Sequence, residues 1–568
     1  GGDAILTGLS VNASDGSTGT IEITDIGDSV AVGVNTGTIS IGNADTASLT
    51  LDGTTYKTDG ITIFEAATGN TILLTGASPT ITTTNDNLTF DGGSIVLSTA
   101  GTTTIDTELG GSGAGNVLID GTINGTSSEN EALVINGGSG SVTVNGAIGA
   151  TNPLTTITIG SAGAGTIEVT NIGAGSAGAT LATAIGNTST GTLTLDGTVY
   201  NTGDTQTYTA ATGGGNIDIT GAATFTTSAD NIAFNTSGVD LVASVAITTG
   251  TGGAGTVSFG GAIDTDSEGT RTLTIDSGSG SVTFSGAIGL TNALGGLNVN
   301  ATDNDGDGVI TFSKDIGDTS AGVKGVTAVG NSSTAQIVFA EDTYTFDTGA
   351  TTFTATSGDN FDLTKGATTT FTTVGTDITF TTGAIALADG SNLVIDTGSG
   401  NGDITVGEIA GTTVETVTID AGTGATSVGV IGNGTEIGVL QIGSSDNGAI
   451  TLNGAITTDG AVTIDGPVTL ATTNISVTTA DDAISFNHKI NGTQSLTLES
   501  GTGAITLDGV IGGDAILTGL SVNATDGDNS NTGTIEITDI GDAAAVGVDT
   551  GSISIGNAYT SSLTLDGT

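Results

Sequence analysis

Apolar side chains alternate with threonine or serine over many short stretches of the chain. The stretches include residues 20–24 (TIEIT), 38–41 (TISI), 48–51 (SLTL), 87–90 (NLTF) and 141–144 (SVTV). An alternation with a period of two is typical of a β-strand that buries one face. No convincing apolar stripe follows the 3.6-residue period of a helix, and 97 glycines disfavour helices throughout. The pattern predicts an all-β protein made of short strands.

Asn-Gly and Asp-Gly dipeptides separate these strands. They occur at Asp52-Gly53, Asp91-Gly92, Asn136-Gly137, Asn145-Gly146, Asp196-Gly197, Asn453-Gly454 and Asp508-Gly509. Such dipeptides readily supply the positive φ that a tight corner demands. We therefore expect left-handed corners at these positions.

A long repeat dominates the chain. Residues 1–54 reappear at 512–568 with 46 of 54 positions identical and a three-residue insertion at 529–531. This match is far beyond chance, so the sequence has a period of about 511 residues. A shorter period marks related segments that start at Gly138, Gly278, Gly422 and Gly501. The sequence therefore divides into cassettes at 1–137, 138–277 and 278–421, a shortened cassette at 422–511, and the start of the next unit at 512–568.

A second set of related segments recurs within the cassettes. TIEITDIGD begins at residue 20, TIEVTNIG at 166 and VITFSKDIGD at 309. Each is followed about 28 residues later by a segment that resembles a strand, namely SLTLDGT, TLTLDGT or QIVFAED. The recurrence supports a chain built from similar structural turns.

Short strands at this spacing fit two architectures. The first is a parallel β-helix (β-solenoid), predicted here as one continuous rod over residues 1–568. The second is a string of β-sandwich (Ig-like) domains. The β-helix is favoured because it needs only a narrow aliphatic interior, whereas a sandwich usually has an aromatic plug and more than 3 prolines. With roughly 22 residues per turn and about 4.8 Å between turns, the rod would have about 25 turns and a length of about 120 Å.

Charge is sparse and mostly of one sign. The chain has 59 acidic residues, 6 basic residues and a formal net charge of -53. Nucleic acids and anionic membranes are unsuitable partners because both require a cationic surface. An acidic surface favours divalent cations instead. The sequence has no apolar run as long as a membrane span and no cysteine for a disulfide. Without a methionine or a signal peptide, we expect a processed segment of a longer protein.

The strongest candidate for a metal site is the segment DNDGDG at residues 303–308. Its alternating carboxylates resemble an EF-hand loop, which predicts Ca²⁺ ligands at Asp303, Asp305 and Asp307. Lys314 occupies the twelfth position, where an EF-hand has a bidentate glutamate. The alternative is a solvated turn between two strands. No other cofactor is expected.

Candidates for catalysis are weak, so we expect no enzymatic activity and no catalytic residue. His488 is the only histidine, and its neighbours favour an exposed edge over a ligand or a Ser/His/Asp triad. The pairs Asp481-Asp482 and Glu341-Asp342 have the residue types of a glycosidase, but the chain has no tryptophan and only one arginine to hold a sugar. The GTGGAG segment at 250–255 is a chance match in a glycine-rich chain.

Residues 486–524 (FNHKINGTQSLTLESGTGAITLDGVIGGDAILTGLSVNA) resemble secreted exoproteins of the filamentous-haemagglutinin type and giant bacterial β-strand-repeat surface proteins. The resemblance lies in the style of the repeats and covers nearly the whole chain. It implies secretion across an outer membrane and a β-helical adhesin or cell-surface fibre. The expected location is therefore extracellular, at the bacterial cell surface.

These observations predict a structural extracellular protein. Its copies would associate end to end and side by side to form a fibre, a sheath or a surface layer. One alternative is the stalk of a secreted adhesin that presents a distal binding domain to a host or neighbouring cell. A remote alternative is a polysaccharide-active β-helix enzyme.

Overall fold

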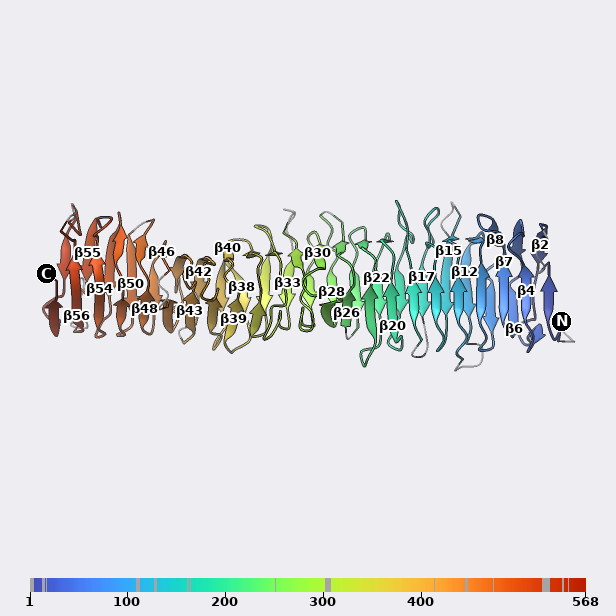
Figure 1. Cartoon of the computed structure of the whole chain (residues 1–568), viewed down its shortest axis with the longest axis horizontal. Coiled ribbons are helices and arrows are strands. Elements are labelled where there is room, and N and C mark those ends of the chain that lie inside the picture. Colours follow the sequence, from blue (N-terminus) through green and yellow to red (C-terminus); the bar gives the residue numbers. More distant parts are fainter. Residues whose placement is uncertain are drawn as a thin grey trace. The chain divides into compact units, whose positions relative to one another are not determined.

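The chain folds as two compact units, Gly1–Gly286 and Ala287–Thr568, in a computed structural model. The described residues are 5–12, 16, 18–108, 113–126, 130–160, 163, 165–236, 238–250, 252–301, 308–412, 414–444, 448–472, 474–523, 532–543, 546–549 and 551–567. They contain no helix, and their strands form a parallel β-solenoid of about 21 turns (Figure 1). This confirms the predicted fold class and rules out the string of β-sandwiches.

The strands of the first unit form three stacks, and most turns add one strand or bridge to each. Stack A contains β1 (Leu9–Val11), β4 (Ile39–Gly42), β7 (Thr62–Glu65), β10 (Leu88–Asp91), β13 (Val117–Ile119), β16 (Val142–Val144), β18 (Ile167–Val169), β20 (Thr192–Leu195), β23 (Asn216–Ile219), β26 (Gly238–Leu241) and β29 (Ala262–Thr265). Stack B contains β2 (Thr20–Ile23), β5 (Ser48–Leu51), β8 (Thr71–Leu74), β11 (Ser94–Leu97), β14 (Ile123–Asn124), single bridges at Ile148 and Ile172, β21 (Val199–Asn201), β24 (Thr224–Thr226), β27 (Val245–Thr248) and β30 (Thr272–Asp276). Stack C contains β3 (Val34–Asn35), β6 (Thr55–Asp59), β9 (Thr80–Thr83), β12 (Gly101–Asp106), β15 (Glu131–Asn136), β17 (Ile157–Gly160), β19 (Thr183–Gly186), β22 (Gln206–Thr209), β25 (Ile232–Asn235), β28 (Val257–Phe259) and β31 (Val282–Phe284).

The second unit also has three stacks, and its long strands each contribute to two of them. Stack D contains β32 (Gly296–Val299), β34 (Thr327–Val329), β37 (Thr351–Thr354), the first halves of β40 (Ile378–Leu387), β42 (Ile404–Ala410) and β44 (Thr426–Ile431), then β46 (Ile450–Leu452), β49 (Val468–Leu470), β52 (Ile490–Gly492) and the second halves of β54 (Ile505–Ile511) and β56 (Thr534–Ile540). Stack E contains β33 (Val309–Phe312), β35 (Gln336–Phe339), β38 (Asp359–Leu363), the second halves of β40, β42 and β44, then β47 (Ile456–Thr458), β50 (Ile475–Thr479), β53 (Ser495–Glu499), β55 (Gly519–Val522) and β57 (Ile553–Ile555). Stack F contains β36 (Thr343–Thr345), β39 (Thr369–Thr372), β41 (Leu393–Asp396), β43 (Thr416–Asp420), β45 (Val439–Gly443), β48 (Val462–Asp465), β51 (Ile484–Phe486), β54 (Ile505–Ile511), β56 (Thr534–Ile540) and β58 (Ser562–Leu565).

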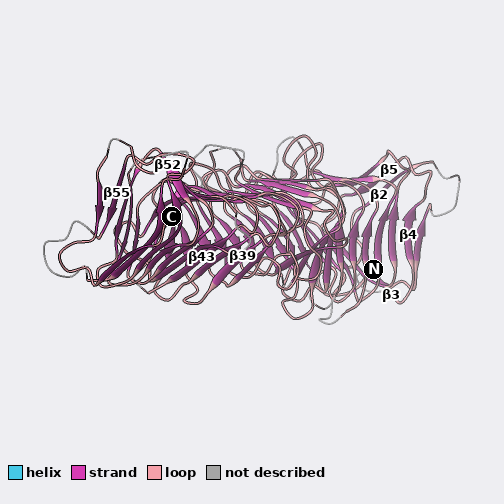
Figure 2. Cartoon of the chain, turned by 60° about the vertical axis from the view of Figure 1, so that its left-hand side comes forward, coloured by secondary structure: helices cyan, strands magenta, loops and turns pink. Residues whose placement is uncertain are grey.

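Successive turns pair in parallel, and the number of residues per turn varies. Leu9 pairs with Ile39, which lies 30 residues later, whereas Ile450 pairs with Val468, only 18 residues later. Figure 2 shows such parallel strands within each unit, for example β39 and β43 in stack F. The constant feature is the strand register, while the corner loops differ in length. The described chain makes about 21 turns, fewer than the 25 or so that roughly 22 residues per turn predicted, because many turns are longer.

The alternation in the sequence corresponds to the two faces of each strand. In β5, Leu49 and Leu51 are buried while Ser48 and Thr50 lie toward the surface. All five stretches singled out in the sequence coincide with strands, namely β2, β4, β5, β10 and β16. The period-two pattern was thus a sufficient guide to strands and to their inward side chains.

The interior is more aromatic than predicted. All 14 phenylalanines and four of the 5 tyrosines are buried. In stack C, Tyr208, Phe234, Phe259 and Phe284 occupy the same position on consecutive turns. The Phe234 and Phe259 rings stack with centroids 4.9 Å apart and planes 7° apart. The core is made mostly of Ile, Leu and Val, as expected, but it also contains columns of rings that were not predicted, because in-register turns align large rings as readily as branched chains.

Most Asn-Gly and Asp-Gly corners do not use a positive φ. Among the seven dipeptides, only Gly92 has a left-handed φ, of 70°. At Gly53 a Cβ would fall on the carbonyl oxygen of Thr24, and at Gly197 on that of Thr170, each one turn earlier. Glycine is needed at these two positions because the backbone of the preceding turn passes too close for any side chain.

The glycines that begin the related segments of the shorter period do take the left-handed conformation. Gly138, Gly278, Gly422 and Gly501 have φ values of 56°, 52°, 54° and 56°. Three of them donate a backbone hydrogen bond to the Asn or Asp side chain two residues earlier, as Gly278 N does to Asp276 Oδ1 at 3.1 Å. The recurrent sequence motif therefore marks a recurrent corner of the solenoid.

A buried tyrosine holds the second recurrent segment to the turn that follows. The Tyr200 hydroxyl donates to Val169 O at 2.8 Å and accepts from Gly197 N at 3.0 Å. Asn171 Oδ1 accepts hydrogen bonds from the backbone of Thr198 and Val199, both at 2.9 Å. Tyr56 and Asp25 make the same contacts in the preceding cassette. Each TIEITDIGD-type segment and the strand about 28 residues after it therefore lie on adjacent turns, which the tyrosine and the Asn or Asp side chain join by hydrogen bonds.

Two buried glutamates order corner loops, Glu131 in the first unit and Glu415 in the second. Glu415 Oε2 accepts hydrogen bonds from Thr412 N at 2.6 Å and Val414 N at 3.3 Å. Burial raises the pKa of Glu415, but hydrogen bonds from Thr412 and other backbone groups outweigh burial and hold the pKa below its usual value. The carboxylate therefore replaces water as the acceptor for this loop.

We expect Gly197→Ala to lower the free energy of unfolding by about 2 kcal/mol or more, because the added Cβ displaces the preceding turn. Gly175→Ala is the matched control, since a Cβ there meets nothing within 4 Å. It should change stability by less than about 0.5 kcal/mol. Urea unfolding followed by circular dichroism measures both changes. Equal stability of the two variants would contradict the close-approach explanation.

We expect Glu415→Gln to destabilise the chain by about 1–3 kcal/mol at neutral pH, because an amide is a weaker acceptor for the Thr412 loop. A lowered folded-state pKa gives stability that is present above the ordinary value of 4.5 and is lost as pH falls through the folded pKa. The difference between wild type and Glu415→Gln should therefore shrink in acid. The midpoints of urea unfolding of wild type and Glu415→Gln, measured at neutral pH and below about pH 3.5, test this pH dependence. A difference that does not depend on pH would contradict the role of the charge.

Candidate functional site

The predicted calcium ligands Asp303, Asp305 and Asp307 lie outside the described residues. The strands that flank them are β32 and β33. Among the described residues, no three acidic or histidine side chains are grouped so as to hold a metal ion. Calcium binding by the 303–307 segment therefore stays a prediction.

His488 and the acidic pairs make local contacts. His488 Nε2 lies 3.1 Å from Asp465 Oδ1, and its side chain is partly exposed. Glu341 forms ion pairs with Lys365 and with Lys314, and the hydrogen bond from Lys365 lowers its pKa. Asp481 Oδ1 accepts a hydrogen bond from Thr502 N at 2.8 Å, across neighbouring turns. These side chains link loops to one another, as expected for structural polar groups.

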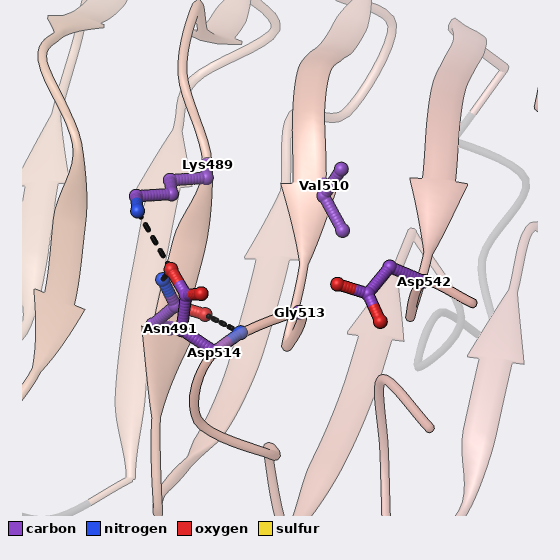
Figure 3. A pocket seen from close by; sticks show the side chains of 6 residues that line it. All are labelled: Lys489, Asn491, Val510, Gly513, Asp514 and Asp542. Carbon is purple, nitrogen blue, oxygen red and sulfur yellow. Dashed lines mark hydrogen bonds and ion pairs between the residues drawn. The ribbon is translucent and has the colours of Figure 1, made fainter. Parts of the chain in front are cut away.

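A shallow hollow of about 190 Å³ lies on the second unit and has both acidic and basic walls (Figure 3). Lys489 Nζ lies 2.6 Å from Asp514 Oδ2, and this hydrogen bond lowers the Asp514 pKa. Asp514 N donates to Asn491 Oδ1 at 3.0 Å, while Asp542 and Val510 form the opposite side. The ion pair is largely exposed, so it contributes little to stability. The described lining residues include no serine, threonine or cysteine that could act as a nucleophile.

Outward-facing hydroxyls form a regular row along stack D. The row runs through paired positions on six consecutive turns, namely Thr352, Thr379, Thr405, Ser427, Thr451 and Thr469. Parallel pairing sets neighbouring hydroxyls about 4.8 Å apart. This row was not predicted from the sequence, although each of its residues is the polar middle residue of a triplet whose outer two residues face inward.

Carboxylates form a similar row along stack A. Asp218, Asp240 and Asp264 pair in register on consecutive turns. Asn216 Nδ2 donates to both Asp218 Oδ1 and Asp240 Oδ2, at 2.5 and 2.8 Å. Burial and the charge of Asp240 raise the Asp218 pKa. Strand register therefore brings these three carboxylates close to one another on the surface of the first unit.

Three aliphatic side chains of β57 and β58 differ in exposure from their equivalents in the first copy of the repeat. Ile553, Leu563 and Leu565 are 49%, 48% and 61% exposed. Their equivalents in the first copy of the repeat are Ile39, Leu49 and Leu51, and all three are 0% exposed. In that copy β4 and β5 are covered by β7 and β8 of the next turn.

The described residues form no helix with the length and hydropathy needed to cross a membrane. Comparison of the chain with protein-family models, with curated proteins and with solved structures finds no match to any of them.

Proposed function

We propose that this protein is a structural protein of the cell exterior, whose solenoid turns form a fibre, a sheath or a surface layer through self-association. The observation that carries the proposal is the in-register backbone pairing of successive turns within each unit. The arrangement extends by adding turns of the same kind, without any new type of contact. A protein of this kind acts through its dimensions and its surface.

The interior supports a mechanical role. Aliphatic or aromatic side chains occupy most of the inward-facing positions of successive turns. The largest side chains, among them Tyr200 and Phe234, are fully buried. In the shallow hollow on the second unit, the charged groups Lys489 and Asp514 bind each other. A molecule made almost entirely of regularly stacked turns is well suited to be a structural component of an assembly.

The surface supports association that is controlled by ions. A net charge of -53 makes copies of the chain repel one another in water of low ionic strength. Rows of hydroxyls and carboxylates provide oxygen ligands of the type that divalent cations prefer. Lateral contact between copies would therefore depend on cations that bridge or neutralise the acidic rows.

The stalk of a secreted adhesin would use the same solenoid without side-by-side association. The number of copies in each particle therefore separates the two hypotheses. Particles that remain single at every protein concentration favour the stalk, whereas ordered multimers favour the fibre, sheath or layer.

We expect calcium to promote lateral bundling of the purified chain and a chelator to reverse it, because bridging removes repulsion between acidic surfaces. Negative-stain electron microscopy and light scattering measure bundling with about 1 mM CaCl₂ and after addition of EDTA. NaCl at matched ionic strength is the control, because it screens charge without bridging. Equal bundling in both salts would contradict the bridging role. A monodisperse monomer under all conditions would contradict self-association itself.

A further inference from the structure

Asparagine followed by glycine is the dipeptide that deamidates most readily, because a glycine without a Cβ lets its backbone nitrogen approach the asparagine side chain. The chain contains eight such pairs, which begin at Asn124, Asn136, Asn145, Asn401, Asn433, Asn447, Asn453 and Asn491. Asn447 lies outside the described residues, and the structure describes the other seven pairs. Within a folded chain the reaction requires room for the backbone of the pair to change its conformation.

Three of the seven pairs are held by a hydrogen bond from the glycine nitrogen, the atom that would have to react. Each nitrogen donates to a carbonyl oxygen on the next turn: Gly125 N to Asn152 O at 3.1 Å, Gly137 N to Gly160 O at 3.2 Å and Gly492 N to Ala515 O at 3.1 Å. All three glycines are buried. Their nitrogens are therefore engaged in the contact between turns.

Three further pairs are held by close packing. A Cβ built on Gly146, Gly402 or Gly454 would lie 2.2, 2.5 or 2.7 Å from an atom of the preceding turn. Gly402 and Gly454 are buried, and Gly146 is half-buried. The backbone of these three pairs therefore has little space to move unless the turn opens locally.

The pair Asn433-Gly434 differs from the other six. Both residues are exposed, and a Cβ on Gly434 would meet nothing within 4 Å. Gly434 N donates no hydrogen bond to another described residue. The pair follows β44 at a corner where Gly432 N donates to Ile409 O at 2.8 Å. The corner is thus anchored at Gly432 and open beyond it.

The same corner recurs after β54. Gly512 N donates to the preceding turn as Gly432 N does, and the two glycines have φ values of 72° and 76°. Gly513 occupies the position that Asn433 has in the earlier corner. The fold of this corner therefore does not require an asparagine, so residue 433 can change while the corner persists.

We propose that Asn433 is a modification site, at which the chain deamidates by its own chemistry. Gly434 N bonds to Asn433 Cγ, the bond from Cγ to Nδ2 breaks, and ammonia leaves with the proton of Gly434 N. Water then adds to one of the two carbonyl carbons of the five-membered ring and opens it. The products are aspartate, with the original backbone, and isoaspartate, whose backbone runs through the former side chain. Water is the only other reactant.

Deamidation changes a contact between two turns. Asn433 Nδ2 donates a hydrogen bond to Glu408 Oε1 at 2.7 Å, and Glu408 lies in β42, one turn earlier. Either product replaces this donor by a carboxylate, so two negative charges face each other and repel. The modified corner therefore separates from β42. This effect arises within one chain and does not rest on the self-association proposed above.

Incubation of the purified full chain at mildly alkaline pH tests the site, because loss of the proton from Gly434 N promotes ring closure. Cleavage after glutamate releases the peptide 416–436, in which Asn433 is the only asparagine. Mass spectrometry should show the amide-to-acid mass increase in this peptide about 10-fold or more faster than at the six held pairs, since those pairs must first open locally. In concentrated urea all the pairs should react at similar rates.

Two variants serve as matched controls. Asn433→Gln should abolish the reaction in peptide 416–436 on this timescale, because the longer side chain would have to close a six-membered ring. Asn453→Gln, at a held pair, should leave the rate at Asn433 unchanged. An Asn433 that stays intact in the folded chain, or that reacts no faster than Asn401, would overturn the proposal.

Asn433→Asp reproduces the aspartate product and tests the effect on the turn contact. We expect backbone hydrogen exchange over residues 426–436 to be faster in this variant than in wild type. The double variant Asn433→Asp/Glu408→Gln should restore the slow exchange, because the new amide donates to the carboxylate at 433. Exchange in Asn433→Asp that equals wild type would overturn the separation of the corner from β42.

Discussion

Hydrogen bonds between the backbones of consecutive turns constrain the other features of both units. Parallel strands about 4.8 Å apart leave no room for a side chain where one corner crosses directly above another. Gly53 and Gly197 lie at such crossings, against the carbonyl oxygens of Thr24 and Thr170. The abundance of glycine is therefore a consequence of the spacing between turns, and only part of it reflects left-handed corners such as Gly138.

The same constraint determines the composition of the interior. A side chain must pack against residues at the same position one turn earlier and one turn later, so residues of similar shape accumulate in columns. Tyr208, Phe234, Phe259 and Phe284 form one such column in the first unit. On the outer face the same register lines up Thr379 with Thr405 and Asp218 with Asp240. The columns of inward-facing side chains stabilise each unit, whereas the rows of outward-facing side chains form the surface that a partner would contact.

Strands and fold class could be predicted from the sequence because they depend on local alternation and on repetition. The strand at 48–51 was located correctly, and the segments beginning at 20 and 166 proved to be bound to the turns that follow them. Properties that depend on the neighbouring turn could not be predicted. The role of Gly53, the stacking of Phe234 and the burial of Glu415 all depend on which residues lie one turn away. Because the number of residues per turn varies, those neighbours cannot be found by counting along the sequence.

Tandem duplication has a physical consequence for the ends of such a solenoid. A unique sequence would need a dedicated capping turn at each end to cover its last apolar residues. A duplicated turn is already compatible on each face with turns like itself, as the matching registers of β1 with β4 and β55 with β57 demonstrate. Ile535 pairs with Leu563 as Ile21 pairs with Leu49, so the two copies of the repeat have the same register.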